Sequence, residues 1–178
     1  MITTKKLVTS ALLVALTVVL TRILGINVLT AKIGFGFIPI IIAAMCYGPV
    51  FSAIVYALAD IIGTFLFPAG AFNPFFTLTA ALAGAVWGLI LYRKAPASLG
   101  GTLAISFIAA FINNVLFSLT ANSYLIHFYY NVALEALIPT RLIQIAIMIP
   151  LQTVFIAVLW KNVVPRLAQW SAPKATNG

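Results

Sequence analysis

The chain alternates between long apolar runs and short breaks that carry polar residues, proline or glycine. Six such runs stand out: residues 7–25, 37–47, 50–67 and 74–92, a fifth from about 101 that fades near Tyr124, and 133–160. A helix that crosses a bilayer needs about 20 predominantly apolar residues. The pattern therefore predicts an all-α integral membrane protein with six transmembrane helices, and Pro139 and Pro150 predict kinks in the last one.

Composition narrows the class of protein. Hydrophobic residues make up 63% of the 178 residues and charged residues only 7%, whereas a soluble domain has about 25% charged residues. This excludes a soluble enzyme, a disordered segment and a secreted disulfide scaffold. Six helices and their connections use nearly the whole length, so we expect a single membrane domain over residues 1–178 with a polar tail from about 165.

The charges predict how the chain is oriented. The chain has ten Lys and Arg residues but only two acidic residues, which gives a net charge of +8. Such an excess indicates nucleic-acid binding in a soluble protein, but in a membrane protein it marks cytoplasmic loops. We therefore expect no nucleic acid partner. Because six spans bring both ends to the same side, we predict a multi-pass cell-membrane protein with cytoplasmic termini, whose inner side holds Lys5, Lys6, Arg93, Lys94, Lys161, Arg166 and Lys174.

Polar side chains inside the apolar runs are the first candidates for a site. Ionisable groups cost about 2.5–3.5 kcal/mol at the centre of a membrane helix and usually serve a function. Asp60 and Arg141 are such groups, and Asn113 and Gln144 fall at a similar estimated depth. We expect them to converge in one polar layer that opens to the outside. Two alternatives stay open: Asp60 and Arg141 form a structural ion pair, and the amides merely join helices.

Aromatic residues gather on the same predicted outer side. Lys32 and Phe35 precede the second run and Phe37 begins it, while Phe72, Asn73 and Phe76 follow the third. Flat apolar walls with a few directed polar groups are typical of a small-molecule site, although an interfacial aromatic belt would look similar. In a ligand site, Asp60 would accept hydrogen bonds from an amidine-like edge. The amides would contact other ring atoms, and Lys32, Arg22 or Arg141 would pair with carboxylates.

Several motifs are missing. The sequence has no G-x-x-x-x-G-K-S/T loop, no G-x-S-x-G and no H-E-x-x-H. Cys46 and His127 lack neighbours at metal-ligand spacing. We therefore expect no enzyme activity, no metal and no cofactor, and any uphill transport would draw its energy from other chains.

The first run carries a separate pattern. Ala11 and Ala15 are small residues four positions apart, so they form a flat strip on one helix face. Such a strip allows close approach of a second helix. This face either packs within the bundle or docks a partner subunit.

Longer stretches of the chain resemble a known family, the folate-specific S components of energy-coupling factor (ECF) transporters. The similarity extends over nearly the whole chain. It is carried by Ile33-Gly-Phe-Gly-Phe-Ile-Pro-Ile40, Leu58-Ala-Asp-Ile-Ile-Gly63, Leu66-Phe-Pro68, Phe72-Asn-Pro-Phe-Phe-Thr-Leu-Thr79, Ile138-Pro-Thr-Arg141 and Ile147-Met-Ile-Pro150.

The resemblance implies a six-helix bundle that binds folate from outside. It also implies a complex with a transmembrane coupling (T) subunit and two cytoplasmic ATPases, and toppling of the S component within the membrane. Ala11 and Ala15 would then be docking residues. An S component for another vitamin and a membrane scaffold without a transport role remain the alternatives.

Overall fold

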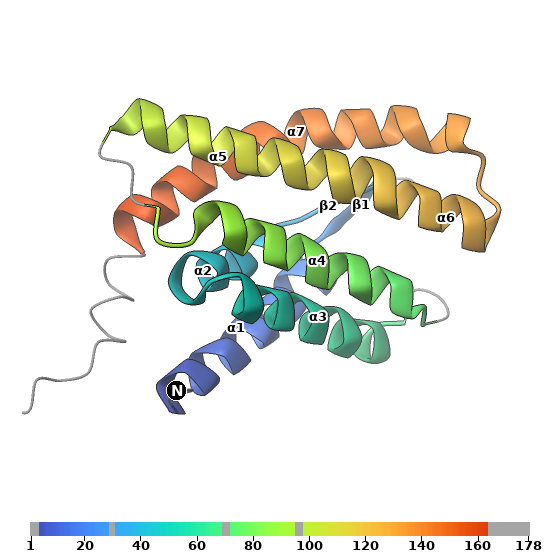
Figure 1. Ribbon diagram of the computed structural model, residues 1–178. Coiled ribbons are helices and arrows are strands. Elements are labelled where there is room, and N and C mark those ends of the chain that lie inside the picture. Colours follow the sequence, from blue (N-terminus) through green and yellow to red (C-terminus); the bar gives the residue numbers. More distant parts are fainter. Residues whose placement is uncertain (1–3, 29–30, 69–71, 95–97, 164–178) are drawn as a thin grey trace, which may run out of the picture.

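The apolar runs fold into helices, with one small hairpin between the first two (Figure 1). The computed structural model describes residues 4–28, 31–68, 72–94 and 98–163, and it places their side chains except those of Lys5 and residues 26–33. The elements are α1 (Thr4–Arg22), β1 (Ile26–Val28), β2 (Ala31–Ile33), α2 (Phe37–Tyr47), α3 (Pro49–Leu66), α4 (Pro74–Leu91), α5 (Leu99–Asn113), η1 (Asn114–Ala121), α6 (Asn122–Tyr130) and α7 (Leu134–Asn162).

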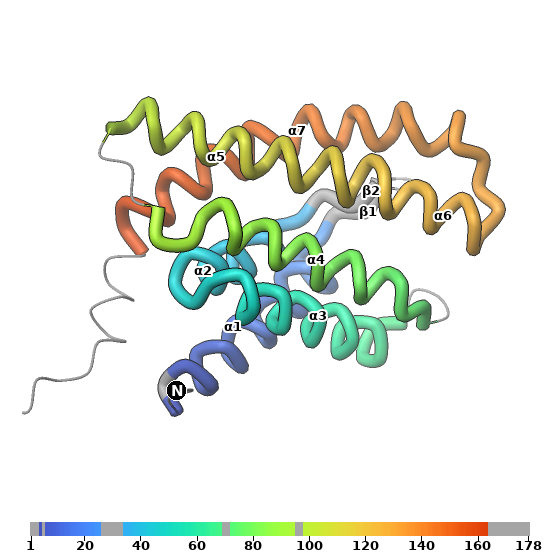
Figure 2. Tube along the Cα trace, viewed as in Figure 1, coloured from blue at the N-terminus to red at the C-terminus, as the bar shows by residue number. Residues whose placement is uncertain are grey.

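Local sequence explains where several helices begin. Pro49 and Pro74 stand in the first turns of α3 and α4, where a missing N–H costs no helical hydrogen bond. The side chain of Asn73 caps α4 by accepting a hydrogen bond from the backbone N–H of Phe75 at 3.0 Å. The predicted kinks of the last helix agree with the trace of α7, which changes direction along its length (Figure 2).

Two features differ from the sequence prediction. The segment between α1 and α2 forms an antiparallel hairpin, with Ile26 paired to Ile33, where the apolar pattern predicted only a connection. The fifth apolar run does not fade near Tyr124 but continues through η1 and α6 to Tyr130. The hairpin could not be predicted from the sequence, because strands of three residues are too short to show an alternation of apolar and polar residues.

Four helical segments in the described part of the chain are long and apolar enough to cross a membrane: α3, α4, Leu99–Tyr130 and α7. At about 1.5 Å per residue, the 11 residues of α2 cover only about half of a hydrocarbon layer of about 30 Å, so the crossing predicted there would have to include the chain next to α2. Six spans and cytoplasmic termini therefore stay predictions. The tail from residue 165, including Arg166 and Lys174, lies outside the described residues.

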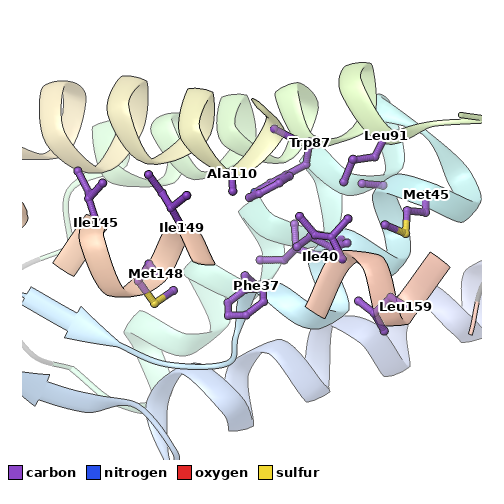
Figure 3. Packing of buried hydrophobic residues seen from close by; sticks show 14 residues of the cluster. Phe37, Ile40, Met45, Trp87, Leu91, Ala110, Ile145, Met148, Ile149 and Leu159 are labelled. Carbon is purple, nitrogen blue, oxygen red and sulfur yellow. The ribbon is translucent and has the colours of Figure 1, made fainter. Parts of the chain in front are cut away.

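The main core lies where α2, α4, α5 and α7 meet. Figure 3 shows side chains from these helices converging, among them Ile40, Trp87 and Ile149. A second cluster packs Leu13, Val14 and Val18 of α1 against residues of α2 and α3. One face of α1 is thus buried, whereas Ala11 and Ala15 lie exposed on another.

Helices α3 and α4 approach each other closely at the first turn of α3. The hydroxyl of Ser52 donates to the backbone carbonyl of Gly84 at 2.6 Å. A Cβ atom on Gly84 would collide with the Ser52 backbone, so only glycine permits this approach. The close contact aligns the outer half of α3, with Asp60, beside the first turns of α4.

Candidate ligand-binding site

A cavity of about 270 Å³ opens among the helices. Its wall combines aromatic, small and amide side chains with one cation. It is lined by Thr21, Gly34, Gly36, Phe37, Ile40, Tyr56, Ala83, Trp87, Asn113, Asn114, Phe117, Ser118, Asn122, Arg141, Gln144, Met148 and Gln152. Residues far apart in the sequence therefore form one hollow of the kind that holds small molecules.

Two neighbouring asparagines in the wall differ in their hydrogen bonding. Asn114 donates from Nδ2 to Oε1 of Gln152 at 2.6 Å and to the carbonyl of Ala110 at 2.8 Å. Asn113 is only 5% exposed, and neither Oδ1 nor Nδ2 has a partner among the described residues. A buried amide without partners costs about 1–3 kcal/mol. Asn113 therefore presents both a donor and an acceptor to whatever enters the cavity.

Arg141 is the charged residue of the wall and is 8% exposed. Its Nη1 donates to Oε1 of Gln144 at 3.0 Å, and the same oxygen accepts from Ser118 at 3.4 Å. Its Nε is buried without a partner within the described part of the chain. No ion pair of Arg141 with either acidic residue is found there, so the alternative of a structural Asp60–Arg141 ion pair is wrong. A hydrogen-bond acceptor or an anion in the cavity would satisfy the buried guanidinium of Arg141.

A π-helical segment brings the amides of the wall together. Asn122 follows Asn113 by nine residues, which is two and a half turns of an α-helix at about 3.6 residues per turn and would place the two on opposite faces. The segment η1 lies between them. Its wider i→i+5 turns reduce the separation to about two turns, so both residues reach the cavity. The pattern of apolar residues gives no signal for this shift.

The rest of the wall consists of aromatic side chains and of a close contact between the end of α1 and the chain before α2. Phe37, Tyr56, Trp87 and Phe117 provide aromatic surface. Gly36 lies directly against Thr21, and a Cβ atom at this position would overlap the Thr21 hydroxyl. The end of α1 and the chain before α2 therefore form one continuous piece of the wall.

The structure brings three of the nine predicted site residues into this wall, namely Asn113, Arg141 and Gln144. Asp60 lies elsewhere among the described residues: it accepts a hydrogen bond from Thr77 at 2.7 Å and lies 4.0 Å from Nη2 of Arg22. The partner of Asp60 is thus Arg22, a residue from the end of α1 that sequence spacing could not associate with it.

The three predicted aromatic residues, Phe35, Phe72 and Phe76, are not in the lining of the cavity, and each packs near other aromatic rings. Phe35 is 39% exposed, and its ring packs near the rings of Phe37 and Phe155. Phe72 stacks on Phe65 with ring centroids 5.4 Å apart. Phe76 lies 6.4 Å from the Tyr130 ring.

A second hollow of about 300 Å³ collects the aromatic residues at the start of α4 and the end of α6. Its lining includes Phe72 and Asn73, together with Pro74, Phe75, Tyr129 and Tyr130. Asn73 acts here as a helix cap. The side chain of Lys32 lies outside the described residues. Within the described part, no three His, Cys, Asp or Glu residues gather as a metal site would require.

Comparison with known proteins identifies the fold around this cavity. The family of ECF transporter substrate-specific components matches residues 5–170. This chain belongs to that family. A curated folate transporter FolT from Clostridium novyi (strain NT) is 35% identical to this S component over 153 residues, 86% of each chain. A FolT from Leuconostoc mesenteroides is 35% identical over 91 residues, 51% of this chain and 48% of the other.

A solved structure shares the architecture. It is described as the crystal structure of FolT bound with folic acid. The two chains align with a TM-score of 0.77 and 29% identity, and the alignment covers 96% of each. Family membership and the apolar helices make this S component a multi-pass membrane protein and a transporter subunit rather than an enzyme.

Proposed function

We propose that this S component binds folate in the cavity and delivers it to an ECF transporter. The proposal is supported by the similarity to two folate transporters and to a FolT whose crystal structure contains folic acid. In the membrane the chain crosses six times, with both termini in the cytoplasm and the cavity facing outside.

The unpartnered polar atoms of Asn113 and Arg141 carry the assignment of the site. The pterin ring of folate has donors and acceptors side by side along one edge, which complements both atoms of a carboxamide. Its ring carbonyl and its carboxylates are acceptors for a guanidinium nitrogen. Folate therefore carries the hydrogen-bond partners that the polar atoms of Asn113 and Arg141 lack in the cavity wall.

Each part of the wall has a role in this arrangement. Asn113 reads the pterin edge, and Trp87 and Phe37 offer aromatic surface to the flat ring. Arg141 binds a carbonyl or carboxylate oxygen, while Gln144 holds its other end in place. Lys32, in the hairpin between α1 and α2, remains a candidate for the glutamate carboxylates.

Delivery requires partners. The exposed strip of Ala11 and Ala15 on α1 docks on a T subunit, which is coupled to two cytoplasmic ATPases that supply the energy. The S component topples within the bilayer and carries its cavity from the outer to the inner side. Large apolar side chains are exposed over its helices, and such a surface keeps contact with lipid during reorientation.

A ligand-dependent thermal shift tests the proposed substrate. The purified protein in detergent is heated with folate, with p-aminobenzoyl-glutamate (which lacks the pterin) and with thiamine or riboflavin. At a folate concentration of 100 times Kd, binding adds about 2.7 kcal/mol to the stability of the folded state, and the other compounds produce no comparable shift. A shift with another vitamin alone would assign a different substrate, and no shift with any vitamin would support a scaffold.

A further inference from the structure

A polar cluster outside the cavity joins three helices, and the proposed function does not use it. It consists of Arg22 at the end of α1, Asp60 and Thr64 of α3, and Thr77 of α4. Nη2 of Arg22 donates to Thr64 Oγ1 at 2.9 Å and lies 4.0 Å from Oδ1 of Asp60. Oδ2 of Asp60 accepts from Thr77 at 2.7 Å. We call these four residues the Arg22 cluster.

The Arg22 cluster depends on a glycine. A Cβ atom on Gly63 would lie 2.8 Å from Nε of Arg22, which is closer than side-chain atoms pack. The Arg22 side chain therefore lies across α3 in space that a side chain at position 63 would take, and a Cβ atom there would displace it. The positive charge also stands at the C-terminal end of α1, where the helix dipole stabilises it.

The same end of α1 supplies part of the cavity wall. Thr21 precedes Arg22, and successive residues of a helix point about 100° apart. Thr21 consequently lines the cavity while Arg22 lies over α3. Thr21 in turn touches Gly36, the residue before α2. Tyr56, one turn before Asp60, lines the cavity from α3.

We propose that the Arg22 cluster positions the Thr21–Gly36 part of the cavity wall and thereby sets the affinity for folate, without touching the ligand. This inference rests on the proposed function. Asp60 is then a positioning residue that holds Arg22, and it does not itself hydrogen-bond to the pterin ring. Side chains in direct contact with a ligand hold their geometry only if neighbouring residues lock it.

The test compares Gly63→Ala with Gly100→Ala, a control in α5 whose added Cβ meets nothing within 4 Å. Both changes replace a helical glycine by alanine, but only the new methyl group at position 63 meets Arg22. We expect Gly63→Ala to weaken folate binding about tenfold, a change expected when contacting residues are coupled, and Gly100→Ala to leave it unchanged. Asp60→Asn weakens binding in the same way, whereas Asp60→Glu retains most of it.

A double-mutant cycle separates positioning from a general loss of stability. If Gly63→Ala acts by displacing Arg22, it has no further effect on affinity in an Arg22→Ala background. Equal effects with and without Arg22 would overturn the inference, as would wild-type affinity in both Gly63→Ala and Asp60→Asn.

A readout without ligand distinguishes this inference from the proposed function. The amides of Ile23 and Leu24 bond to the Val19 carbonyl at the end of α1. We expect their hydrogen exchange to quicken in Gly63→Ala and not in Gly100→Ala. If wild-type protein binds no folate, the proposed function fails, and faster exchange still supports the positioning role. Unchanged exchange would reject that role whether or not folate binds.

Discussion

At the scale of single residues, burial without a hydrogen-bond partner distinguishes Asn113 from the other amides. Asn114 and Gln152 satisfy each other across two helices at 2.6 Å, so they stabilise the bundle. Asn113 is equally buried, but its side chain makes no hydrogen bond with the described part of the chain. The sequence predicts that polar residues in this run matter, but it cannot say which amide bonds to a neighbour and which faces the cavity.

This difference gives a paired prediction. Asn113→Leu removes a buried amide that has no partner, so it raises the melting temperature of the ligand-free protein. It also weakens folate binding about 10- to 100-fold, because the pterin edge loses its hydrogen bonds. Thermal unfolding and isothermal titration calorimetry measure the two effects.

The matched control is the neighbouring Asn114→Leu. This change leaves Gln152 unsatisfied in the core, so it lowers the melting temperature of the ligand-free protein. If Asn113→Leu destabilised the protein as much and bound folate normally, Asn113 would be a structural amide.

At the scale of elements, α1 has one buried face and one exposed face. Leu13, Val14 and Val18 pack into the bundle, while Ala11 and Ala15 are exposed. The sequence indicated the small-residue strip but left open whether it packs inside. Only the placement of α2 and α3 on the opposite face of α1 leaves the strip available to a partner.

Ala15→Trp is expected to block assembly without affecting the cavity. The indole prevents close approach of a partner helix, so the T subunit and the ATPases no longer co-purify and folate uptake is lost, while folate binding by the isolated protein stays normal. Leu103→Trp, at an exposed position of α5, is the control and assembles normally. Co-purification of the complex with Ala15→Trp would show that the partner docks elsewhere.

At the scale of the whole molecule, the charges still predict the orientation. Arg93 and Lys94 lie in the connection between α4 and α5. The connection between α6 and α7 lies at the opposite end of the bundle (Figure 1). The excess of cations near the connection between α4 and α5 predicts that this connection lies in the cytoplasm.

Cysteine labelling tests this orientation. In a Cys46→Ser background, Ala133→Cys is expected to react with a membrane-impermeant maleimide in intact cells, because it is exposed before α7. Lys94→Cys reacts only after the cells are permeabilised. The reverse pattern would invert the topology and place the cavity on the cytoplasmic side.

The sequence by itself determined the membrane class, most of the helix bounds and the polar residues worth testing, because these follow from apolar periodicity and the cost of burying charge. It predicted Arg141, Asn113 and Gln144 as site residues, and the structure places all three in the cavity wall. Only the tertiary structure paired Asp60 with Arg22, placed Phe72 in a separate aromatic hollow and introduced the π-helical segment η1. Those outcomes depend on which helices become neighbours and on a single local change in helical pitch, and neither is encoded in the spacing of residues along one segment.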